Sequence, residues 1–543
     1  MTKQQKKVLR ILLLIAVFYF LVFIPPNSVG ADDINMLSIF EIDEYALYRY
    51  NVRMIEGGDT IKASLWKFIT YQHYNYGFPS HFVSAIVILP LKILGPSYYT
   101  TTNIMLVSRQ IISVLPMLLA ILTLVYLQTR FHSLWKSLFV FFFLLSIPAV
   151  FRNNMWLHPD SLTILFIVLT FFFLDRDKQT FGRNFYYAAI ACGIATGTKI
   201  IGLFFFITIP TYLAWGYFSK RISIKTAVIR ALTFVGIMFV VFLICNPMLF
   251  FPGPREAAIK MQRNLSRSIS HGWVVEYDKG PLPWFRMITK YYGEGFILIL
   301  VNMILIIGVL LGPRRLYNTL VLTWAVPISL YIFFVIVIRP FHFYLPIVLP
   351  VYSASIGILL WPFNNREFEQ GNLRTSRSIR VLCQLALIVI GYQFILNVVW
   401  DTEEYNLTLN KEELSPSLTF FDSVEQECLD YIPNDIFMSI THDRSIYVPV
   451  SDRWTSKLTR SLVDYEYVQE NNFHILLLSQ QRIKDYTQPD SLDKAVDRTE
   501  MIAAQEFFAD VTSYSVEGYE LCYEDEFGFV YIREDLFQEY FEK

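Results

Sequence analysis

The feature that most constrains this 543-residue chain is a series of long apolar runs with almost no charge. About 20 such residues cross the hydrocarbon core of a bilayer as one helix, because a helix satisfies its backbone hydrogen bonds internally. Runs near this length lie at 9–25, 105–128, 135–151, 161–174, 185–198, 200–217, 228–247, 294–311, 318–337, 343–361 and 379–399. The sequence therefore predicts an all-α polytopic membrane protein with about eleven transmembrane helices.

Composition agrees with this class. Hydrophobic residues make up 54% of the chain and charged residues 17%, below the roughly 25% of an ordinary soluble domain. The net charge of −1 gives no general attraction for nucleic acid. The five cysteines lie far apart and predict neither a metal site nor a disulfide framework. The first run lacks a small-residue cleavage site, so we interpret it as a retained helix rather than a signal peptide.

Basic residues in short loops predict the orientation. With eleven spans and a cytoplasmic N-terminus, the main basic clusters all fall on the cytoplasmic side: Lys3, Lys6, Lys7 and Arg10; Arg130 and Lys136; Arg176, Lys178 and Arg183; Lys220, Arg221, Lys225 and Arg230; Arg314 and Arg315; and Arg366, Arg374, Arg377 and Arg380. Residues 79–95 are apolar but short, and counting them as a span would invert every later loop. We therefore expect an interfacial helix there.

Two long loops and one domain then lie outside. The first external loop is 26–104. The second, 248–292, is basic although external and includes Arg263, which suits it to hold a phosphate. Residues 402–543 are rich in Asp and Glu, with a predicted buried strand in "NFHILLLSQ" and a hairpin turning near Phe527 and Gly528. The sequence thus predicts a transmembrane module, 1–401, and a soluble extracytoplasmic α/β domain, 402–543.

Four groups of polar residues fall on the external side at or near membrane depth. They are Asp43 and Glu44 after the first span, His158 and Asp160 at the mouth of the fourth, Lys199 between two apolar stretches, and Arg339 and His342 where a late span begins. A charge within the membrane costs about 2.5–3.5 kcal/mol on insertion scales, so it usually faces a cavity and marks function.

Sugar transfer gives these residues a shared purpose. An acceptor hydroxyl needs a base, and a nearby carboxylate can take its proton. A lipid-linked phosphate leaving group carries negative charge that Lys and Arg stabilise. A lipid carrier also accounts for a chain without a phosphate-binding P-loop or a dinucleotide-binding glycine motif. Tyr76, in "YQHYNY", could stack on a sugar.

The order and spacing of several motifs resemble the C superfamily of glycosyltransferases, in its protein O-mannosyltransferase and aminoarabinose-transferase-like branch. The resemblance covers residues 9–400 and depends on "IDEYALYRYNVRMIEGG", "YNYGFPSHFVSAIVILPLKILG", "SRQIISVLPMLLAILTLVYL", "HPDSLTILF", "ATGTKIIGL" and "RPFHFYLPIVLP". His342 departs from it, because a Tyr commonly follows the Arg in the family.

The resemblance implies an inverting transferase that uses a polyprenyl- or dolichyl-phosphate sugar, with a glycan, lipid or protein acceptor. Asp43 matches the family's catalytic acid–base position, with Glu44 beside it. Asp160 matches the second acid. Lys199 and Arg339 match contacts with the donor phosphate.

Structural interpretations stay open for each residue. Asp43, Glu44 and Asp160 could cap helix N-termini. Lys199 could extend along the helix to the membrane interface, and Arg339 could anchor a span at its edge. We interpret His158 and His342 as structural rather than as metal ligands, and we predict no metal site, although carboxylates could hold a divalent ion.

Two other function classes compete with the enzyme. A transporter or flippase for a lipid-linked glycan would share charged cavity residues, but it should show inverted repeats, which the sequence lacks. A non-catalytic subunit of a glycan assembly complex would tolerate Asp43→Asn. Loss of sugar transfer after that substitution, at normal expression, distinguishes the enzyme from both.

Overall fold

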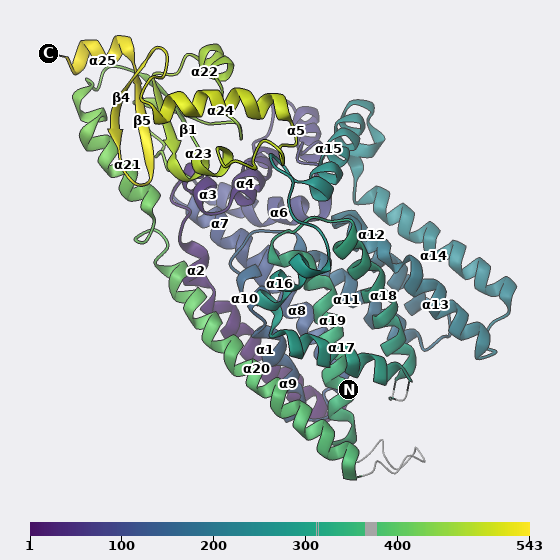
Figure 1. Cartoon of the computed structure of the whole chain (residues 1–543). Helices are drawn as coiled ribbons and strands as arrows, with labels where there is room; N and C mark the ends of the chain where they lie inside the picture. Colours follow the sequence, from purple (N-terminus) through teal and green to yellow (C-terminus); the bar gives the residue numbers. More distant parts are fainter. Residues whose placement is uncertain (311, 313, 364–376, 543) are drawn as a thin grey trace.

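A computed structural model describes residues 1–310, 312, 314–363 and 377–542. A bundle of helices makes up most of the molecule, and a small domain containing a sheet lies at one end of it (Figure 1). Residue 311, at the end of one predicted span, and the basic residues Arg366 and Arg374 lie outside the described part of the chain.

Six helical stretches within the described residues are long and apolar enough to cross a membrane: Thr101–Thr129, Ile200–Phe218, α14 (Ile224–Ile244), α18 (Arg315–Phe334), Phe341–Phe363 and α20 (Arg377–Leu409). The helices α16 (Pro281–Tyr292) and α17 (Gly295–Leu310) would add a seventh if they count as one span, since they meet at a bend of 94°. The protein is therefore a multi-pass membrane protein, as predicted.

Four other predicted spans form helices that are shorter or more charged than these six stretches. They are α1 (Lys3–Val22), α9 (Leu134–Leu145), α11 (Asp160–Asp177) and α12 (Arg183–Thr198). The predicted span 135–151 is broken, because α9 ends at Leu145 and α10 (Pro148–Asn153) starts anew with a proline in its first turn. The total of eleven spans stays a prediction.

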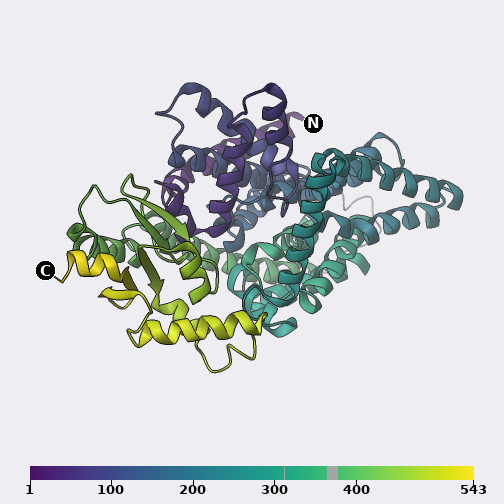
Figure 2. The ribbon, with the colours of Figure 1, turned by 90° about the horizontal axis from the view of Figure 1, so that it is seen from above.

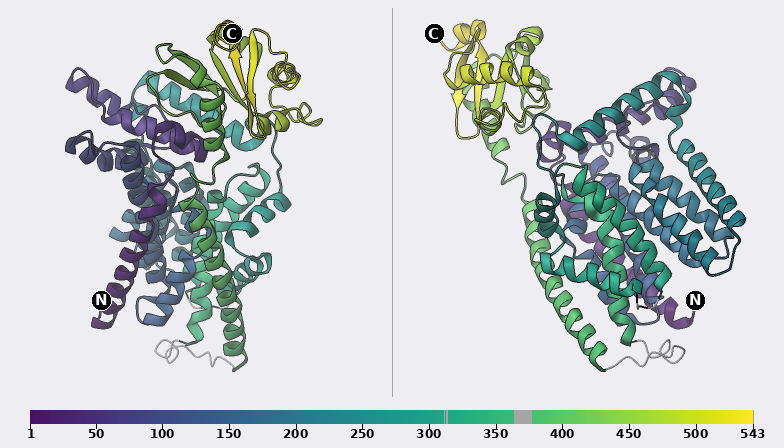
Figure 3. Two further views of the ribbon diagram at one scale, coloured as in Figure 1. Left: turned by 90° about the vertical axis from the view of Figure 1, so that its left-hand side faces the viewer. Right: turned by 45° about the vertical axis from the view of Figure 1, so that its right-hand side comes forward.

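The basic loops gather at the end of the bundle where the N-terminus lies, opposite the sheet domain (Figures 1 and 3). Gln5 donates a hydrogen bond to the carbonyl of Arg130 at 2.9 Å. Arg130 and Arg314 both pair with Asp175 at 2.5 Å. Loops far apart in sequence therefore share one end of the bundle, as the distribution of basic residues predicted.

The first external loop folds as a layer of short helices between the bundle and the sheet domain. They are α2 (Ile24–Ser28), α3 (Ile34–Phe40), α4 (Ile42–Ile55), α5 (Ile61–Ile69), α6 (Phe78–Leu94) and α7 (Thr101–Ser108), and Thr101–Thr129 continues through the π-helix Arg109–Val114 and α8 (Leu115–Thr129). Helix α6 exposes Phe82, Ile86, Leu89 and Ile93, which lie along one face. Such a face suits the interfacial placement that we expected for 79–95.

The second external loop contains η3 (Pro247–Phe250), α15 (Pro252–His271) and α16. Helix α15 lies near α5, at the same end of the bundle as the sheet domain (Figure 1). Beyond it the chain runs through α17, α18, η4 (Phe341–Tyr344), α19 (Leu345–Leu360) and η5 (Trp361–Phe363). Helices α13 (Phe205–Phe218, after η2, Ile200–Phe204) and α14 form a pair that extends away from the rest of the bundle (Figures 1 and 2).

The C-terminal domain contains a five-stranded sheet of order β2-β1-β3-β5-β4. Its strands are β1 (Met438–His442), β2 (Trp454–Leu458), β3 (Ile475–Ser479), β4 (Tyr519–Glu524) and β5 (Gly528–Arg533). Strands β1, β2 and β3 are parallel, and β5 runs antiparallel to β3 and β4. Strand β3 is wholly buried, and β4 and β5 form the predicted hairpin. The predicted α/β domain is confirmed.

Helices cover this sheet: α21 (Pro416–Glu427), η6 (Leu429–Tyr431), α22 (Tyr465–Asn471), α23 (Gln480–Tyr486), α24 (Arg498–Thr512) and α25 (Glu534–Tyr540). Helix α20 continues without a break through the boundary predicted at residue 401 and ends at Leu409. A disulfide joins Cys428 to Cys522, 94 residues apart in sequence. The cysteine spacing did not indicate this disulfide, because only the fold brings these two distant cysteines together.

Candidate active site

The centre of the candidate site is Asp160, the first residue of α11. Pro159 precedes it, and a carboxylate in this position interacts favourably with the positive end of the helix dipole. The side chain is fully buried. A buried carboxylate needs compensating partners, and the fold supplies them from two other parts of the chain.

Three predicted residues surround Asp160. The Nζ of Lys199, where α12 ends, lies 2.6 Å from Oδ1. Nδ1 of His158 lies 2.7 Å from Oδ2, and Nε2 of His342 lies 4.0 Å from the same oxygen. Both histidines are buried, whereas the Lys199 side chain is 19% exposed. The structure therefore brings together four residues from three of the polar groups that the sequence singled out.

Tyr76, a residue of the first external loop, joins this cluster. Its hydroxyl lies 2.7 Å from Nε2 of His158. The loop approaches α12 closely, since the Gly77 amide donates to the Thr198 carbonyl at 3.0 Å, and a Cβ at Gly77 would lie 1.5 Å from the Gly197 carbonyl oxygen. Only glycine permits this approach. Burial, and then the neighbouring charges of Asp43 and Asp160, raise the pKa of Tyr76 well above its usual value.

Metal-binding geometry is partly present here. Donor atoms of His158, Asp160 and His342 lie within 4.8 Å of one another. Ligand atoms of one tetrahedral zinc ion lie about 3.3 Å apart, and the separations of 2.7 and 4.0 Å from the carboxylate straddle that value. Lys199 already neutralises the carboxylate. A cation bound by these three side chains would compete with Lys199 for the carboxylate.

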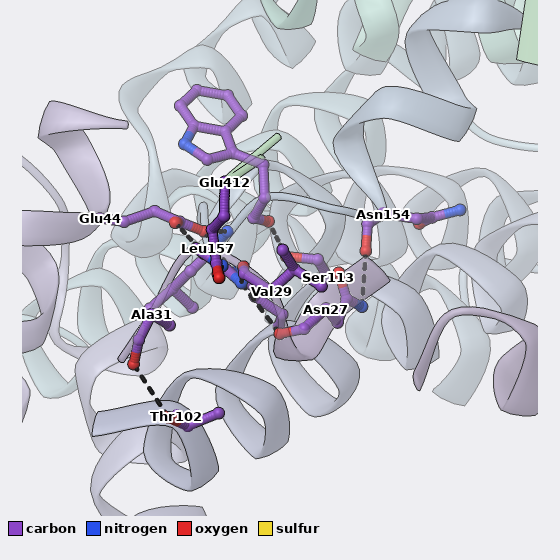
Figure 4. Close-up of polar contacts among 12 residues, drawn as sticks. Asn27, Val29, Ala31, Glu44, Thr102, Ser113, Asn154, Leu157 and Glu412 are labelled. Atoms are coloured by element: carbon purple, nitrogen blue, oxygen red, sulfur yellow. Dashed lines mark hydrogen bonds and ion pairs between the residues drawn. The ribbon is translucent and has the colours of Figure 1, made fainter. Parts of the chain in front are cut away.

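Glu44, another of the predicted acids, is also buried but lies in a separate centre (Figure 4). Arg109 binds it with two nitrogens, Nε to Oε1 at 2.9 Å and Nη2 to Oε2 at 2.5 Å. The Leu157 amide donates to Oε1 at 2.6 Å. Arg109 also donates to the carbonyls of Asn27 and Val29 at 2.9 and 3.1 Å. Both oxygens of Glu44 are thus engaged by the protein.

Asp43, the residue before Glu44, is exposed. It forms no hydrogen bond or ion pair with any other described residue, yet its charge acts on both Tyr76 and Arg339. Helix α4 therefore directs two neighbouring carboxylates into opposite environments, one closed and one open.

Arg339 lies in the loop between α18 and η4 and is 9% exposed. One of its terminal nitrogens donates to the Ser268 carbonyl of α15. Its guanidinium lies 5.8 Å from the Trp273 ring and 5.7 Å from the Tyr277 ring. Burial lowers the pKa of Arg339, against the opposing effects of Tyr277 and Asp43. Its Nε is buried and has no hydrogen-bond partner among the described residues, so the guanidinium keeps an unused donor.

A cavity of about 330 Å³ opens beside Lys199, between the loop that ends at Gly77, the end of α12, η3 and α15. Arg263, the predicted basic residue of the second external loop, lines it together with Lys199. Its other walls include the apolar side chains of Phe242, Met248, Leu249 and Ile259. The cavity thus combines two cations with an apolar surface.

Two residues of this region, Arg109 and Trp156, were not predicted from the sequence as site residues. Arg109 is 1% exposed, and a charged residue inside the apolar run 105–128 was the available signal. Trp156 stacks on His158 with ring centroids 4.1 Å apart and planes at 15°. No sequence signal distinguishes Trp156 from the many other aromatic residues.

No protein-family model matches the chain, and no curated protein sequence matches it. The chain does match solved structures in fold. ArnT from Cupriavidus metallidurans, bound to undecaprenyl phosphate, aligns with a TM-score of 0.51 at 10% identity over 96% of this chain and 97% of ArnT. The apo state of ArnT gives 0.50 at 11% identity over the same shares.

The archaeal oligosaccharyltransferase AglB from Archaeoglobus fulgidus, in complex with an inhibitory peptide and a dolichol-phosphate, gives 0.47 at 12% identity over 96% of this chain and 74% of AglB. The likeness to ArnT, over nearly the full length of both chains, shows that this protein has the GT-C fold of integral-membrane glycosyltransferases. The fold expected from the sequence resemblance is thereby confirmed.

Proposed function

We propose that this protein is a membrane glycosyltransferase that moves a sugar from a polyprenyl-phosphate donor to an acceptor hydroxyl. The single observation that carries the proposal is the position of Lys199. It is paired with buried Asp160 and opens at the same time onto a partly apolar cavity that contains Arg263. The crystal structure of ArnT, a protein of the same fold, with bound undecaprenyl phosphate supports a lipid-phosphate ligand.

The donor phosphate would bind between cations. An ammonium has three donors, of which Lys199 gives one to Asp160. Arg263 forms no ion pair with a described residue and is exposed at the cavity. Arg339 would supply a third cation, whose Nε has no hydrogen-bond partner among the described residues and on which the charge of Asp43 acts. These groups would stabilise negative charge as the lipid phosphate leaves.

Asp43 would act as the base. An exposed carboxylate without protein partners can take the proton of an acceptor hydroxyl, whose oxygen then attacks the anomeric carbon. The bond from that carbon to the phosphate oxygen breaks, and the lipid phosphate leaves with the electron pair. Attack from the face opposite the leaving group inverts the configuration. The proton ends on Asp43.

The other predicted residues would position these groups. Glu44 fixes α4 through Arg109 and so holds Asp43 at the site. Asp160 holds Lys199 in place, and His158 connects Asp160 to Tyr76, which could contact the sugar. His342 completes the buried environment of Asp160.

We place this chemistry on the extracytoplasmic face, with the N-terminus in the cytoplasm. The disulfide between Cys428 and Cys522 supports this, because structural disulfides persist in oxidising compartments. The first external loop, which contributes Asp43 and Tyr76 to the site, lies at the end of the bundle that carries the sheet domain (Figure 1).

The test is sugar transfer by membranes that contain the protein, assayed with a panel of undecaprenyl-phosphate and dolichyl-phosphate sugars. Asp43→Asn should reduce transfer about 10²–10⁴-fold, the usual contribution of a general base. Glu56→Gln changes another exposed acid, at the end of the same helix, and should leave transfer unchanged. Equal transfer by the Asp43→Asn and wild-type proteins would show that Asp43 is not the base, and transfer no greater than in membranes without the protein would favour a non-catalytic subunit.

A further inference from the structure

A short segment, residues 272–278, connects α15 to the residues before α16 and contacts two other parts of the molecule. We call it the strap. Gly272 starts it with φ of +134°, and a Cβ there would lie 2.0 Å from the Val275 carbonyl oxygen. Gly272 and Glu276 form an antiparallel bridge. The strap is therefore a tight turn that requires glycine at its first position.

One side of the strap belongs to the C-terminal domain. Val275 pairs with Ala495 in an antiparallel bridge. The Val496 amide donates to the Val274 carbonyl at 2.9 Å, and the Glu276 amide donates to the Lys494 carbonyl at 2.7 Å. Val274 and Val275 also pack against the hydrophobic core of that domain. The C-terminal domain thus holds the strap by backbone hydrogen bonds and apolar contact.

The other side of the strap belongs to Arg339. Its guanidinium lies within 5.8 Å of the Trp273 and Tyr277 rings, a distance at which a cation interacts with an aromatic face. The Ile338 amide donates to the Asp278 carbonyl at 2.9 Å. The adjacent Val337 amide donates to the Ile269 carbonyl at 3.0 Å. The strap and the end of α15 therefore hold the backbone of the two residues before Arg339 and the side chain of Arg339 itself.

We propose that the C-terminal domain positions Arg339 for the lipid phosphate through the strap, with Trp273 and Tyr277 as the positioning residues. The inference rests on the proposed function, in which Arg339 contacts the donor phosphate. It gives the C-terminal domain a task in donor binding, because the edge segment 494–496 is the part of that domain bonded to the strap.

Val496→Pro is the first variant, because proline removes the amide that donates to Val274. Lys494→Ala is the matched control, since it deletes an exposed side chain next to the same bridge and keeps every backbone hydrogen bond. Hydrogen–deuterium exchange on the full-length protein in phosphatidylcholine nanodiscs should show faster exchange at 272–278 and 337–339 in Val496→Pro. Unchanged exchange of strands β1 to β5 would show that the domain stays folded.

Binding of undecaprenyl phosphate to the same nanodiscs gives the functional readout. Arg339→Gln should weaken binding threefold to tenfold, and Val496→Pro should weaken it to a similar extent. The double variant should bind no more weakly than Arg339→Gln alone, because both changes act through one contact. A purely structural effect of Val496→Pro would instead add to that of Arg339→Gln and would overturn the inference.

A cross-link tests the same contact without destabilising it. Val275 and Ala495 occupy a bridge flanked by hydrogen bonds, a pair in which the Cα atoms lie about 4.5 Å apart and a disulfide fits. In the Val275→Cys, Ala495→Cys protein, oxidation should slow exchange at 337–339 and preserve binding of undecaprenyl phosphate.

The outcomes separate the two proposals. If Arg339→Gln binds undecaprenyl phosphate as the wild type does, the proposed donor contact is wrong. If Arg339→Gln weakens binding but Val496→Pro does not, or if neither Val496→Pro nor the cross-link changes exchange at 337–339, only the role of the C-terminal domain is wrong.

Discussion

Two buried carboxylates, Glu44 and Asp160, differ in how completely the protein satisfies them. Glu44 shares two hydrogen bonds with Arg109 and accepts a third from the Leu157 amide, and both charged side chains are 1% exposed. Around Asp160 the partner Lys199 is 19% exposed, and Oδ2 has no well-aligned hydrogen bond among the described residues.

The difference shows which centre can accept a ligand. A closed ion pair with every acceptor used contributes to the fold and offers nothing to a substrate. When the cation of an ion pair reaches a cavity, a phosphate can replace the water that surrounds this cation. The following predictions test this contrast, from the largest expected effect to the smallest.

Arg109→Leu should destabilise the protein by about 3–5 kcal/mol, because it leaves Glu44 buried without its cation. Thermal unfolding in detergent measures the loss. Arg109→Leu combined with Glu44→Leu should recover most of the stability, since no charge then stays unpaired. A single variant as stable as the wild type would show that the Glu44 centre is not closed.

Lys199→Met should cost less stability, about 1–3 kcal/mol, because the ammonium is partly solvated and His158 still contacts Asp160. Sugar transfer should nevertheless fall about 10²–10³-fold if the ammonium stabilises the leaving phosphate. The same unfolding assay and the membrane transfer assay measure both. A variant that loses stability as Arg109→Leu does, while keeping its transfer rate, would reverse the assignment of the two centres.

Tyr76→Phe removes the hydrogen bond to His158 and should cost about 0.5–1.5 kcal/mol. Tyr48→Phe is a useful control, because its hydroxyl bonds Thr101 at 3.2 Å in the same layer of helices, outside the site. Tyr76→Phe should reduce transfer and Tyr48→Phe should not. Equal transfer rates for the two variants would remove Tyr76 from the site.

The smallest expected effect is on the pH dependence of stability, and it comes from Glu41, three residues before Glu44. Burial, and next the charge of Glu44, raise its pKa from 4.5 to about 7, against the attraction of Arg152 and Lys411. The folded protein thus binds this proton more tightly than the unfolded chain, so the stabilisation is complete below pH 4.5 and is lost as the pH rises through about 7.

Glu41→Gln keeps a neutral side chain at every pH and should remove this dependence. Its Tm should exceed that of the wild type at pH 8 by about 1–3 °C and match it near pH 5. Parallel Tm-against-pH curves for the two proteins would show that Glu41 titrates normally.

Much of the architecture followed from patterns local in sequence. Apolar runs predicted the membrane class, and the short apolar run of β3 together with the β4–β5 hairpin predicted the α/β domain. The break before Pro148 and the continuation of α20 to Leu409 did not follow from hydropathy, because a proline can start a new helix inside an apolar run and a helix can continue beyond the apolar residues. The disulfide between Cys428 and Cys522 was missed because its spacing carries no pattern.

The sequence by itself determined which residues are candidates for the site, since charges and histidines inside apolar surroundings are costly and therefore few. Only the tertiary structure decided their partners. It placed Asp160 against Lys199, His158 and His342, closed Glu44 with Arg109, and left Asp43 open. Neighbours in the chain can point in opposite directions on a helix, and the environment of a carboxylate depends on contacts between segments that sequence distance does not reveal.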